Sequence, residues 1–334
     1  MKNTVVRIAN VVGETGCFRL FSPQTVPVFM VHRVYSGKAS AAAGIPLETL
    51  RSHLNYLARH RYKVLTMDEL LGMLEEGGRI HSKAVVFTID DGFADHFELA
   101  ARVFDEFGFA LNCFVITGFL DSKLWPWDDQ ITHAVNQSTL QQADLRLPSG
   151  ARFSLDMGRD GATKAVRRLR DTLKSGPQEN LYQWIQSELF PNLKVEYPAR
   201  VPPDFAPMSW DNARSLRQSG HGVFPHTRSH RILSTLSPDE KRSEIDESRR
   251  RVEEELGAPA RVFAYPTGRE IDYDQQDVEQ LKECGFKMAF TTVPDYVQKG
   301  QNLLELPRFS VPASSADFRQ IVNRFEALKS RLRA

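Results

Sequence analysis

The sequence has 334 residues, enough for one large α/β domain with an insertion or for two ordinary domains. A hydrophobic content of 41% and a charged content of 25% are typical of a soluble globular protein. The formal net charge of +1 argues against non-specific electrostatic binding of nucleic acid. No segment approaches the roughly 20 apolar residues that are needed to span a bilayer.

The cysteines and the N-terminal segment favour a reducing compartment. Cys17, Cys113 and Cys284 are odd in number and widely spaced, so they indicate neither a disulfide framework nor a paired-cysteine zinc site. The first 21 residues carry scattered charges and lack the apolar core of a signal peptide, so we expect a cytoplasmic protein. Four apolar residues there fit one face of an amphipathic helix, which packs on the domain or, as the less favoured alternative, contacts a membrane surface: Val5, Ile8, Val11 and Val12.

Apolar runs and helical spacing alternate along the first third of the chain. Strands are predicted for residues 26–31, 62–65, 84–89 and 110–116, and helices for 46–58, 67–74 and 95–107. This β-α alternation implies parallel strands joined by right-handed crossovers.

The alternation breaks at about residue 122 and resumes near 205. The intervening segment holds Trp125, Trp127, a basic helical run at 164–174 and a proline-rich return at 198–207. We interpret it as an insertion within a single domain covering residues 1–334. Strands or extended segments are then predicted at 222–224, 261–265, 287–292 and 304–311, with helices at 209–219, 238–256, 274–283 and 317–332. Seven or eight βα units favour a barrel over an open sheet.

Side chains suited to chemistry follow two of the predicted strands. The strand 84–89 runs into Asp90, Asp91 and Gly92, and neighbouring carboxylates repel unless a cation neutralises them. His226 and His230, four residues apart, can bring both imidazoles to one metal ion. With Asp91 they would form a two-histidine, one-carboxylate set, which zinc fits and other divalent metals also match. Taken separately, each signal has a plain alternative: a solvated Asp-Gly turn, or a histidine pair that arises by chance on a surface helix.

Three motifs resemble those of the polysaccharide deacetylase family, carbohydrate esterase family four. Thr88-Ile-Asp-Asp-Gly92 is similar to the family's Thr-Phe-Asp-Asp-Gly, and His226-Thr-Arg-Ser-His230 to its His-Ser/Thr-x-x-His. Phe263-Ala-Tyr-Pro-Thr-Gly268 resembles a variant of its third motif. The likeness to this chitooligosaccharide-deacetylase-type homology domain runs from about Val26 to Val311. It implies a distorted (β/α)7-type barrel with a helical insertion between the fourth strand and the His-x-x-x-His motif.

The resemblance also implies roles for the motif residues. Asp91, His226 and His230 would bind the divalent metal, and Asp90 would be the general base that takes a proton from the attacking water. The backbone N–H of Thr267 would help to hold the oxyanion that forms on the acetamide. Tyr265, in the same motif, is expected to contact the substrate.

The chain departs from the family pattern in two ways. Ala264 stands where the third motif usually supplies an arginine beside the catalytic aspartate, and Arg308 is the candidate substitute, with a surface arginine as the alternative. No histidine follows His230, although the family takes its catalytic acid from a C-terminal Leu-x-x-His. His32 is the candidate acid because Met30-Val-His-Arg-Val34 resembles the start of deacetylases whose acid histidine lies on the N-terminal strand. A structural histidine at the rim is the alternative.

The other histidines are expected at the surface of helices and loops: His53, His60, His81, His96, His133 and His221.

The sequence therefore predicts a metal-dependent N-deacetylase acting on N-acetylhexosamine units of a glycan or of an exopolysaccharide or lipid-linked precursor. Trp125 and Trp127 are predicted either to stack on a sugar ring or to pack in the core. Two other functions stay open: an amidohydrolase or deformylase acting on a small non-glycan amide, and an inactive glycan-binding relative. The intact Asp90, Asp91 and histidine pair argue against the last. The sequence gives neither the glycan, the native metal nor the oligomeric state.

Overall fold

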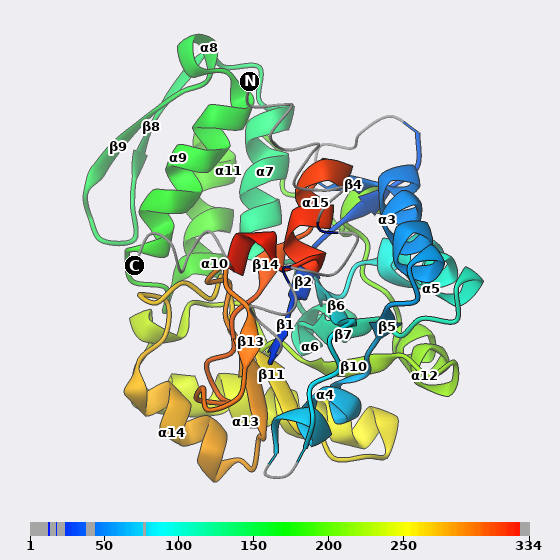
Figure 1. Ribbon diagram of the computed structural model, residues 1–334. Helices are drawn as coiled ribbons and strands as arrows, with labels where there is room; N and C mark the ends of the chain where they lie inside the picture. Colours follow the sequence, from blue (N-terminus) through cyan, green and yellow to red (C-terminus); the bar gives the residue numbers. More distant parts are fainter. Residues whose placement is uncertain (1–12, 14–17, 19–23, 38–43, 76–77, 328–334) are drawn as a thin grey trace.

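A parallel six-stranded sheet lies at the centre of the molecule (Figure 1). The structure is a computed structural model that describes residues 13, 18, 24–37, 44–75 and 78–327, so the predicted N-terminal helix with Val5, Ile8, Val11 and Val12 lies outside the described residues. The strands follow the order β10-β7-β6-β2-β14, and β5 pairs with the start of β6. Their bounds are β2 (Val28–Val31), β5 (Lys63–Val64), β6 (Ala84–Asp91), β7 (Asn112–Val115), β10 (Gly222–Pro225) and β14 (Phe309–Ser310).

Helices follow most of these strands, as the β-α alternation predicts. They are α3 (Leu47–Arg59), α4 (Met67–Leu74), η1 (His96–Ala101), α5 (Arg102–Glu106), α6 (Thr117–Leu120), α12 (Trp210–Gln218), η4 (Leu233–Thr235), α13 (Pro238–Leu256), α14 (Gln275–Glu283) and α15 (Ser315–Val322). Capping boxes at Thr66, Ser209, Ser237 and Asp274 explain where α4, α12, α13 and α14 begin, since each side chain accepts a bond from the N3 backbone N–H.

Strand β6 is buried on both faces because its alternate side chains join two apolar clusters. Val85, Phe87 and Ile89 pack with residues of α3, α5, α12 and α15. Ala84 and Val86 face the opposite way and share a cluster with side chains of β2, β7 and two further strands, β11 (Val262–Ala264) and β12 (Met288–Phe290). The sheet is therefore curved, with the inner faces of its strands packed together.

Strand pairing does not continue all the way around the curved sheet. β11 and β12 pair with each other in parallel, and Phe290 of β12 bridges to Leu306, shortly before β14. Among the described residues no ladder joins β10 to β11. The predicted α/β class with a parallel sheet is confirmed, whereas these pairings do not establish a closed seven-stranded barrel.

Two short strand pairs lie beside the main sheet. They are the antiparallel pair β1 (Thr25–Val26) with β13 (Val297–Gln298), and the parallel pair β3 (Val34–Tyr35) with β4 (Ile45–Pro46).

The predicted insertion packs around an apolar cluster of its own. Figure 1 shows its helices α7 and α9 beside each other, with a long hairpin projecting from them. Its elements are α7 (Trp127–Gln137), β8 (Gln142–Arg146), β9 (Arg152–Asp156), α8 (Met157–Asp160), α9 (Ala162–Lys174), α10 (Leu181–Trp184), η2 (Ile185–Leu189), α11 (Phe190–Asn192) and η3 (Pro203–Phe205). The hairpin corrects the prediction of a purely helical insertion. Its strand β8 buries Ala143 and Leu145 and exposes the residues between them, an alternation that a strand requires.

Two predicted helices also differ in detail. The segment predicted as a helix at 95–107 begins with the π-helical turn η1, which leads into α5. The closing helix was predicted to reach residue 332, but α15 ends at Val322, and Arg324 then takes a left-handed conformation (φ 69°) that a continuous helix excludes. None of the helices in the described ranges has the length and apolar character needed to cross a membrane.

Candidate active site

The carboxyl ends of β6, β7 and β10 bring the motif residues together. Asp91 at the end of β6 pairs in register with Val115 of β7, and Val115 pairs with Pro225 of β10. His226 follows Pro225 directly. Parallel strands therefore place the carboxylates and the first histidine at one edge of the sheet, although they are far apart in the sequence.

Asp91, His226 and His230 form a buried cluster with the donor atoms of a metal site. The Oδ1 atom of Asp91 lies 3.7 Å from Nε2 of His226 and 3.5 Å from Nε2 of His230. The donor atoms of the three residues all lie within 4.8 Å of one another. Oδ1 of Asp91 is buried and has no hydrogen-bond partner within the described part of the chain. An orphaned buried carboxylate oxygen that faces two imidazoles fits a divalent cation.

The environment of His226 leaves the correct nitrogen free. Its Nδ1 lies 2.7 Å from the carbonyl oxygen of Ala264, so Nδ1 carries the hydrogen and the lone pair is on Nε2. Burial lowers the pKa of His226 to about 3, which keeps the ring neutral. A neutral imidazole with a free Nε2 is the form that binds a metal.

Four residues of this site adopt left-handed backbone conformations. The φ angles are 90° at Asp91, 63° at Thr227, 58° at His230 and 54° at Thr267. For residues other than glycine such conformations cost on the order of 1–3 kcal/mol each, and they persist only where surrounding contacts hold them. The contacts of the loop 226–230 are therefore part of the site.

The insertion and the helix α6 hold this loop from one side. The N–H of Gly118 donates to the carbonyl of Arg228 at 2.9 Å, and the indole Nε1 of Trp127 donates to the carbonyl of His230 at 2.9 Å. The hydroxyl of Tyr182 donates to the carbonyl of Ser229 at 2.6 Å. These bonds satisfy three successive loop carbonyls.

Glu244 of α13 holds the loop from the other side. Its side chain is buried, and its Oε2 accepts the backbone N–H groups of Arg228 at 3.0 Å and Ser229 at 2.8 Å. Its Oε1 accepts the hydroxyl of Ser229 and the guanidinium of Arg231. The carboxylate thus fixes the turn between the two histidines.

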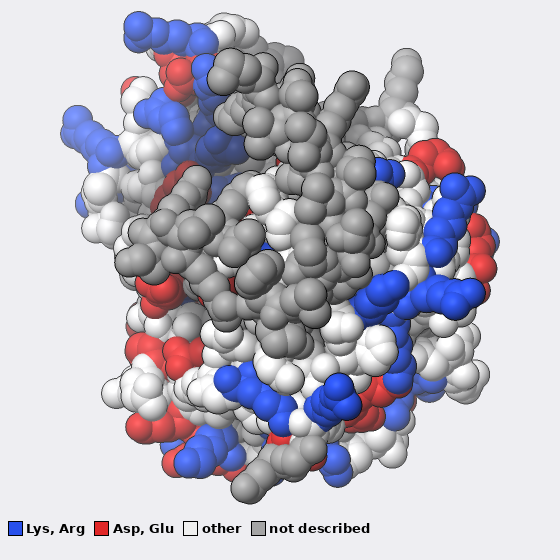
Figure 2. Space-filling view, viewed as in Figure 1, with Lys and Arg blue, Asp and Glu red and all other residues white. Residues whose placement is uncertain are grey.

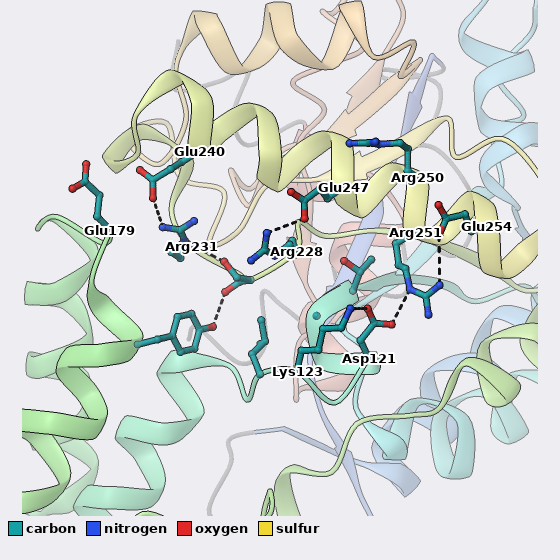
Figure 3. A pocket seen from close by; sticks show the side chains of 15 residues that line it. Asp121, Lys123, Glu179, Arg228, Arg231, Glu240, Glu247, Arg250, Arg251 and Glu254 are labelled. Carbon is teal, nitrogen blue, oxygen red and sulfur yellow. Dashed lines mark hydrogen bonds and ion pairs between the residues drawn. The ribbon is translucent and has the colours of Figure 1, made fainter.

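Behind the loop lies a cavity of about 950 Å³, which Figure 3 shows from close by. Several of its charged side chains are paired with one another: Arg228 lies 2.8 Å from Glu247, and Arg231 lies 2.6 Å from Glu240. These pairs support the outer face of the loop. Asp91 and both histidines are absent from the described lining of this cavity, so it is not the candidate catalytic pocket.

Arg308 reaches Asp90 with both terminal nitrogens. Nη1 donates to Oδ1 at 2.8 Å, and Nη2 lies 2.8 Å from Oδ2. Arg308 is itself held by bonds to the carbonyl of Thr291 and the hydroxyl of Thr88, each 2.9 Å long. Burial raises the pKa of Asp90, but the charge of Arg308, together with the neighbouring histidines and the hydrogen bond from Arg308, brings the pKa below its ordinary value.

His32 lies at the end of β2 and is exposed. It lines a second cavity, of about 640 Å³, together with Asp91, and its charge contributes to the low pKa of Asp90. The carbonyl of His32 lies 2.7 Å from Nε2 of His96, which fixes the backbone at this point. The structure therefore brings His32 to the pocket that Asp91 of the cluster also lines.

Thr267 follows β11, three residues after the carbonyl that contacts His226. Its hydroxyl donates to Asp272, and its carbonyl accepts the hydroxyl of Thr292 at 2.6 Å. These bonds hold the left-handed turn of the third motif in place.

Three predicted substrate contacts are corrected by burial. Trp125 and Trp127 lie inside the apolar cluster of the insertion, so packing, the alternative considered for them, accounts for both rings. Tyr265 is fully buried: its hydroxyl donates to the carbonyl of Leu304 at 2.9 Å, and its ring stacks on Tyr273. None of the three presents a face to a sugar.

Three histidines predicted at the surface are buried instead: His53, His96 and His221. Each ring is amphipathic and finds a polar partner inside the fold. Nε2 of His53 lies 2.8 Å from the carbonyl of Pro312, and Nδ1 of His221 accepts the N–H of Leu111.

The carboxylate of Asp128 lies beside the second histidine, a contact that was not predicted from the sequence. Its Oδ1 lies 3.7 Å from Nδ1 of His230, and its Oδ2 lies 2.6 Å from Nη2 of Arg170 on α9. The adjacent acids Asp128 and Asp129 indicated a negatively charged site in the insertion. The contact of Asp128 with His230, however, joins the insertion to a loop far away in the sequence and cannot be inferred from residue spacing.

The fold and the site define an α/β protein with a buried Asp-His-His cluster at the carboxyl edge of a parallel sheet. The family model described as polysaccharide deacetylase matches residues 180–289, a range that contains the histidine motif and the third motif but not Asp90 or Asp91. The resemblance of the sequence motifs to the polysaccharide deacetylase family is thereby confirmed.

Solved structures share the fold of this chain, and one further relative is similar to it in sequence. The deacetylase PplD of Streptococcus pyogenes in complex with acetate superimposes with a TM-score of 0.60 at 16% identity, covering 89% of this chain and 97% of that one. IcaB from Ammonifex degensii gives a TM-score of 0.57 at 19% identity, with 90% and 97% covered. YxkH from Bacillus subtilis (strain 168) is 19% identical over 289 residues, which are 86% of this chain and 72% of that protein.

Proposed function

We propose that this protein is a metal-dependent N-deacetylase that hydrolyses the acetamide of N-acetylhexosamine units in a glycan or glycan precursor and releases acetate. The observation that carries the proposal is the orphaned carboxylate oxygen of Asp91, which faces the Nε2 atoms of His226 and His230 beside an Asp90 held by Arg308. A site that only bound glycan would not need a fixed carboxylate next to three metal-binding side chains.

Asp91, His226 and His230 would hold the cation, and zinc suits this set of two nitrogens and one carboxylate. A divalent cation so bound would lower the pKa of a water from about 15.7 towards about 7 and polarise the acetamide carbonyl.

The chain's own groups would move the protons. Asp90, kept ionised by Arg308, accepts a proton from the attacking water. The backbone N–H of Thr267 stabilises the oxyanion, and one such donor is typically worth about 3 kcal/mol. His32, exposed in the cavity that also contains Asp91, donates a proton to the leaving amine.

Two other functions compete with this one: hydrolysis of a small non-glycan amide or formamide at the same site, and glycan binding without catalysis. The relatives support a deacetylase, since PplD is described as a deacetylase and was solved with acetate. The identity of the metal, the glycan and a cytoplasmic location stay predictions.

The test is acetate release from N-acetylglucosamine oligomers by the metal-loaded and the chelator-treated protein. We expect release that is lost with chelator and restored by added metal. The variant Asp90→Asn should keep its metal content and lose turnover. Release of formate or of another amine, with no acetate, would support the small-amide function, and metal binding without any turnover would support the binding function.

A further inference from the structure

The cavity that contains Asp91 and His32 is bounded on its far side by one face of helix α9. From this helix Thr163, Val166, Arg167, Arg170, Asp171 and Lys174 line the cavity. Residues three and four apart share a face of a helix, so Arg167, Arg170 and Lys174 form a continuous cationic row. Figure 2 shows blue side chains gathered over this part of the insertion.

Two of the cavity's cations are already neutralised. Nε of Arg33 lies 2.6 Å from Asp95, and Nη2 of Arg170 lies 2.6 Å from Asp128. Asp128 in turn lies 3.7 Å from His230, a predicted metal ligand. Asp128 therefore connects the cationic row to the candidate metal site.

Arg167 and Lys174 have no such partner. Neither makes a hydrogen bond or an ion pair within 4.0 Å in the described part of the chain. Lys174 is half-buried, and burial, together with the charge of Arg170, lowers the pKa of its ammonium group. A half-buried ammonium without a counter-ion is unfavourable, and an anion placed in the cavity would remove this cost.

The carboxyl groups that line the same cavity do not fill this role. Asp91 faces the histidine pair, and Asp128 is bound to Arg170. Burial, followed by the charges of Asp128 and Asp91, raises the pKa of Asp129 well above its ordinary value, which favours its neutral form. Asp171 also lines the cavity, and its charge acts on Lys174, but it is exposed and forms no ion pair with either cation.

We propose that Arg167 and Lys174 bind an anionic group, a phosphate or a carboxylate, that the N-acetylated sugar substrate carries near its acetamide. This inference rests on the proposed deacetylase function and narrows its substrate class to anionic glycans. Guanidinium and ammonium groups are the usual protein partners of both anions. The cavity volume of about 640 Å³ is within the range of about 300–1,000 Å³ that small ligands occupy.

The anion has two chemical sources. It is either the phosphate of a sugar phosphate, as in a nucleotide-linked or lipid-linked precursor, or the carboxylate of a neighbouring uronic acid in a polymer. Three probes separate them: N,N′-diacetylchitobiose as the neutral substrate, N-acetylglucosamine 1-phosphate, and a disaccharide of glucuronic acid and N-acetylglucosamine.

Steady-state acetate release from the three probes tests the inference. We expect KM for one of the anionic probes to be about tenfold lower than KM for the neutral probe. A tenfold difference corresponds to about 1.4 kcal/mol, which one charge-assisted contact can supply. Lys174→Gln and Arg167→Gln should reduce this preference, and Lys174→Arg should restore it. Preference for the phosphate or for the uronate supports the inference and identifies the source.

Arg168→Gln is the matched control. Arg168 is the next residue on α9, but its guanidinium points to Asp160 on the outer side, at 2.6 Å, and it does not line the cavity. The preference for anionic probes should survive this change. Equal KM values for neutral and anionic probes, in the unaltered protein and in Lys174→Gln alike, would overturn the inference.

A binding measurement keeps this result separate from the deacetylase proposal. Calorimetric titration of the Asp90→Asn protein with inorganic phosphate and with glucuronate should show binding that weakens in high salt and in Lys174→Gln. If no probe releases acetate, the deacetylase proposal fails while this titration still decides the anion site. If acetate is released and neither anion binds, the anion site fails and the deacetylase proposal stands.

Discussion

Arg308 and Asp90 form a buried ion pair in which Nη1 donates to Oδ1 at 2.8 Å and Nη2 lies 2.8 Å from Oδ2. The two residues are 218 positions apart. A planar guanidinium and a carboxylate match in this geometry, so the contact fixes both the charge and the orientation of the carboxylate. Arg308 lies directly before β14 and thereby supplies the cation that Ala264 cannot.

Replacing Arg308 by methionine should therefore disable the proposed base and destabilise the fold. The buried carboxylate of Asp90 would be left unpaired, a change that typically costs about 3–5 kcal/mol. Turnover should lose much of the about 10²–10⁴-fold contribution of a general base. Acetate release and urea unfolding measure the two effects. Arg308→Lys keeps the charge but not the two contacts, so its turnover and stability should lie between those of the unaltered protein and of the methionine variant. Unaltered turnover in the methionine variant would exclude a role of Arg308 in supporting Asp90.

The sequence was sufficient to predict the parts of this site that depend on strand order. The buried run before Asp90 and the histidine pair after β10 indicated carboxyl ends of parallel strands, and such ends lie at one edge of a sheet. The resemblance led to Arg308, because Ala264 stands where the family's third motif usually supplies an arginine. The resemblance added the metal-binding roles, which no spacing alone establishes.

The contacts of the insertion could not be predicted in this way. Trp127 and Glu244 act through bonds to the backbone of the loop 226–230, and backbone acceptors leave no pattern in the sequence. Aromatic residues such as Trp125 also suit a sugar site and a core equally well, so only burial distinguishes them. The hairpin β8–β9 alternates over too few residues, within a polar stretch, to stand out.

Loss of His32 should slow turnover without loss of metal. In His32→Asn the side chain still fills the rim of the cavity but cannot carry a proton near neutral pH, so protonation of the amine would depend on water. We expect kcat to fall by about 10²-fold or more at unchanged metal content, measured by acetate release and elemental analysis. An amide substrate with a better leaving group should regain most of the rate; if the rate loss is the same for every leaving group, His32 is not the acid.

Glu244 should control metal affinity through the shape of the loop. Both carboxylate oxygens of Glu244 accept hydrogen bonds. Oε2 accepts the N–H groups of Arg228 and Ser229, and Oε1 accepts the hydroxyl of Ser229 and the guanidinium of Arg231. In Glu244→Gln the amide NH₂ would oppose one of these donor sets. Metal affinity should fall by about 10–100-fold, the usual effect of losing a group that orients ligands.

Glu247→Gln is the control for this change. Glu247 lies on the same helix and pairs with Arg228, but at a partly exposed position, so its loss should change metal affinity little. Competition with a chelating dye gives the affinity of both variants. Equal affinities for the two would show that Glu244 does not orient the loop.

Trp127 should act on the metal site and not on the substrate. Trp127→Phe removes the N–H that donates to the carbonyl of His230, leaving a buried acceptor without its partner, at a cost of about 1–3 kcal/mol. Trp125→Phe is matched to it, because the indole nitrogen of Trp125 has no hydrogen-bond partner among the described residues. Metal affinity should fall in the first variant and hold in the second. If both variants instead raise KM at full metal affinity, the rings contact sugar after all.

Asp277, in the first turn of α14, should make stability depend on pH. Burial raises the pKa of its carboxyl to about 6, despite a bond from the N–H of Asp274 and a nearby Lys241. The folded state therefore favours the protonated form more than the unfolded state does, where the pKa is about 3.9. This contribution to stability is fully present below the unfolded pKa and is lost as the pH rises through the folded pKa.

Asp277→Asn removes this titration while keeping an oxygen that can accept the N–H of Asp274. The variant should be more stable than the unaltered protein above about pH 7, by on the order of 2 kcal/mol, and the difference should shrink towards about pH 4. Urea unfolding across this range measures it. Asp144→Asn, an exposed position on β8, should show no such trend. A stability difference for Asp277→Asn that is constant between the two pH limits would mean that the Asp277 carboxyl keeps its ordinary pKa in the folded protein.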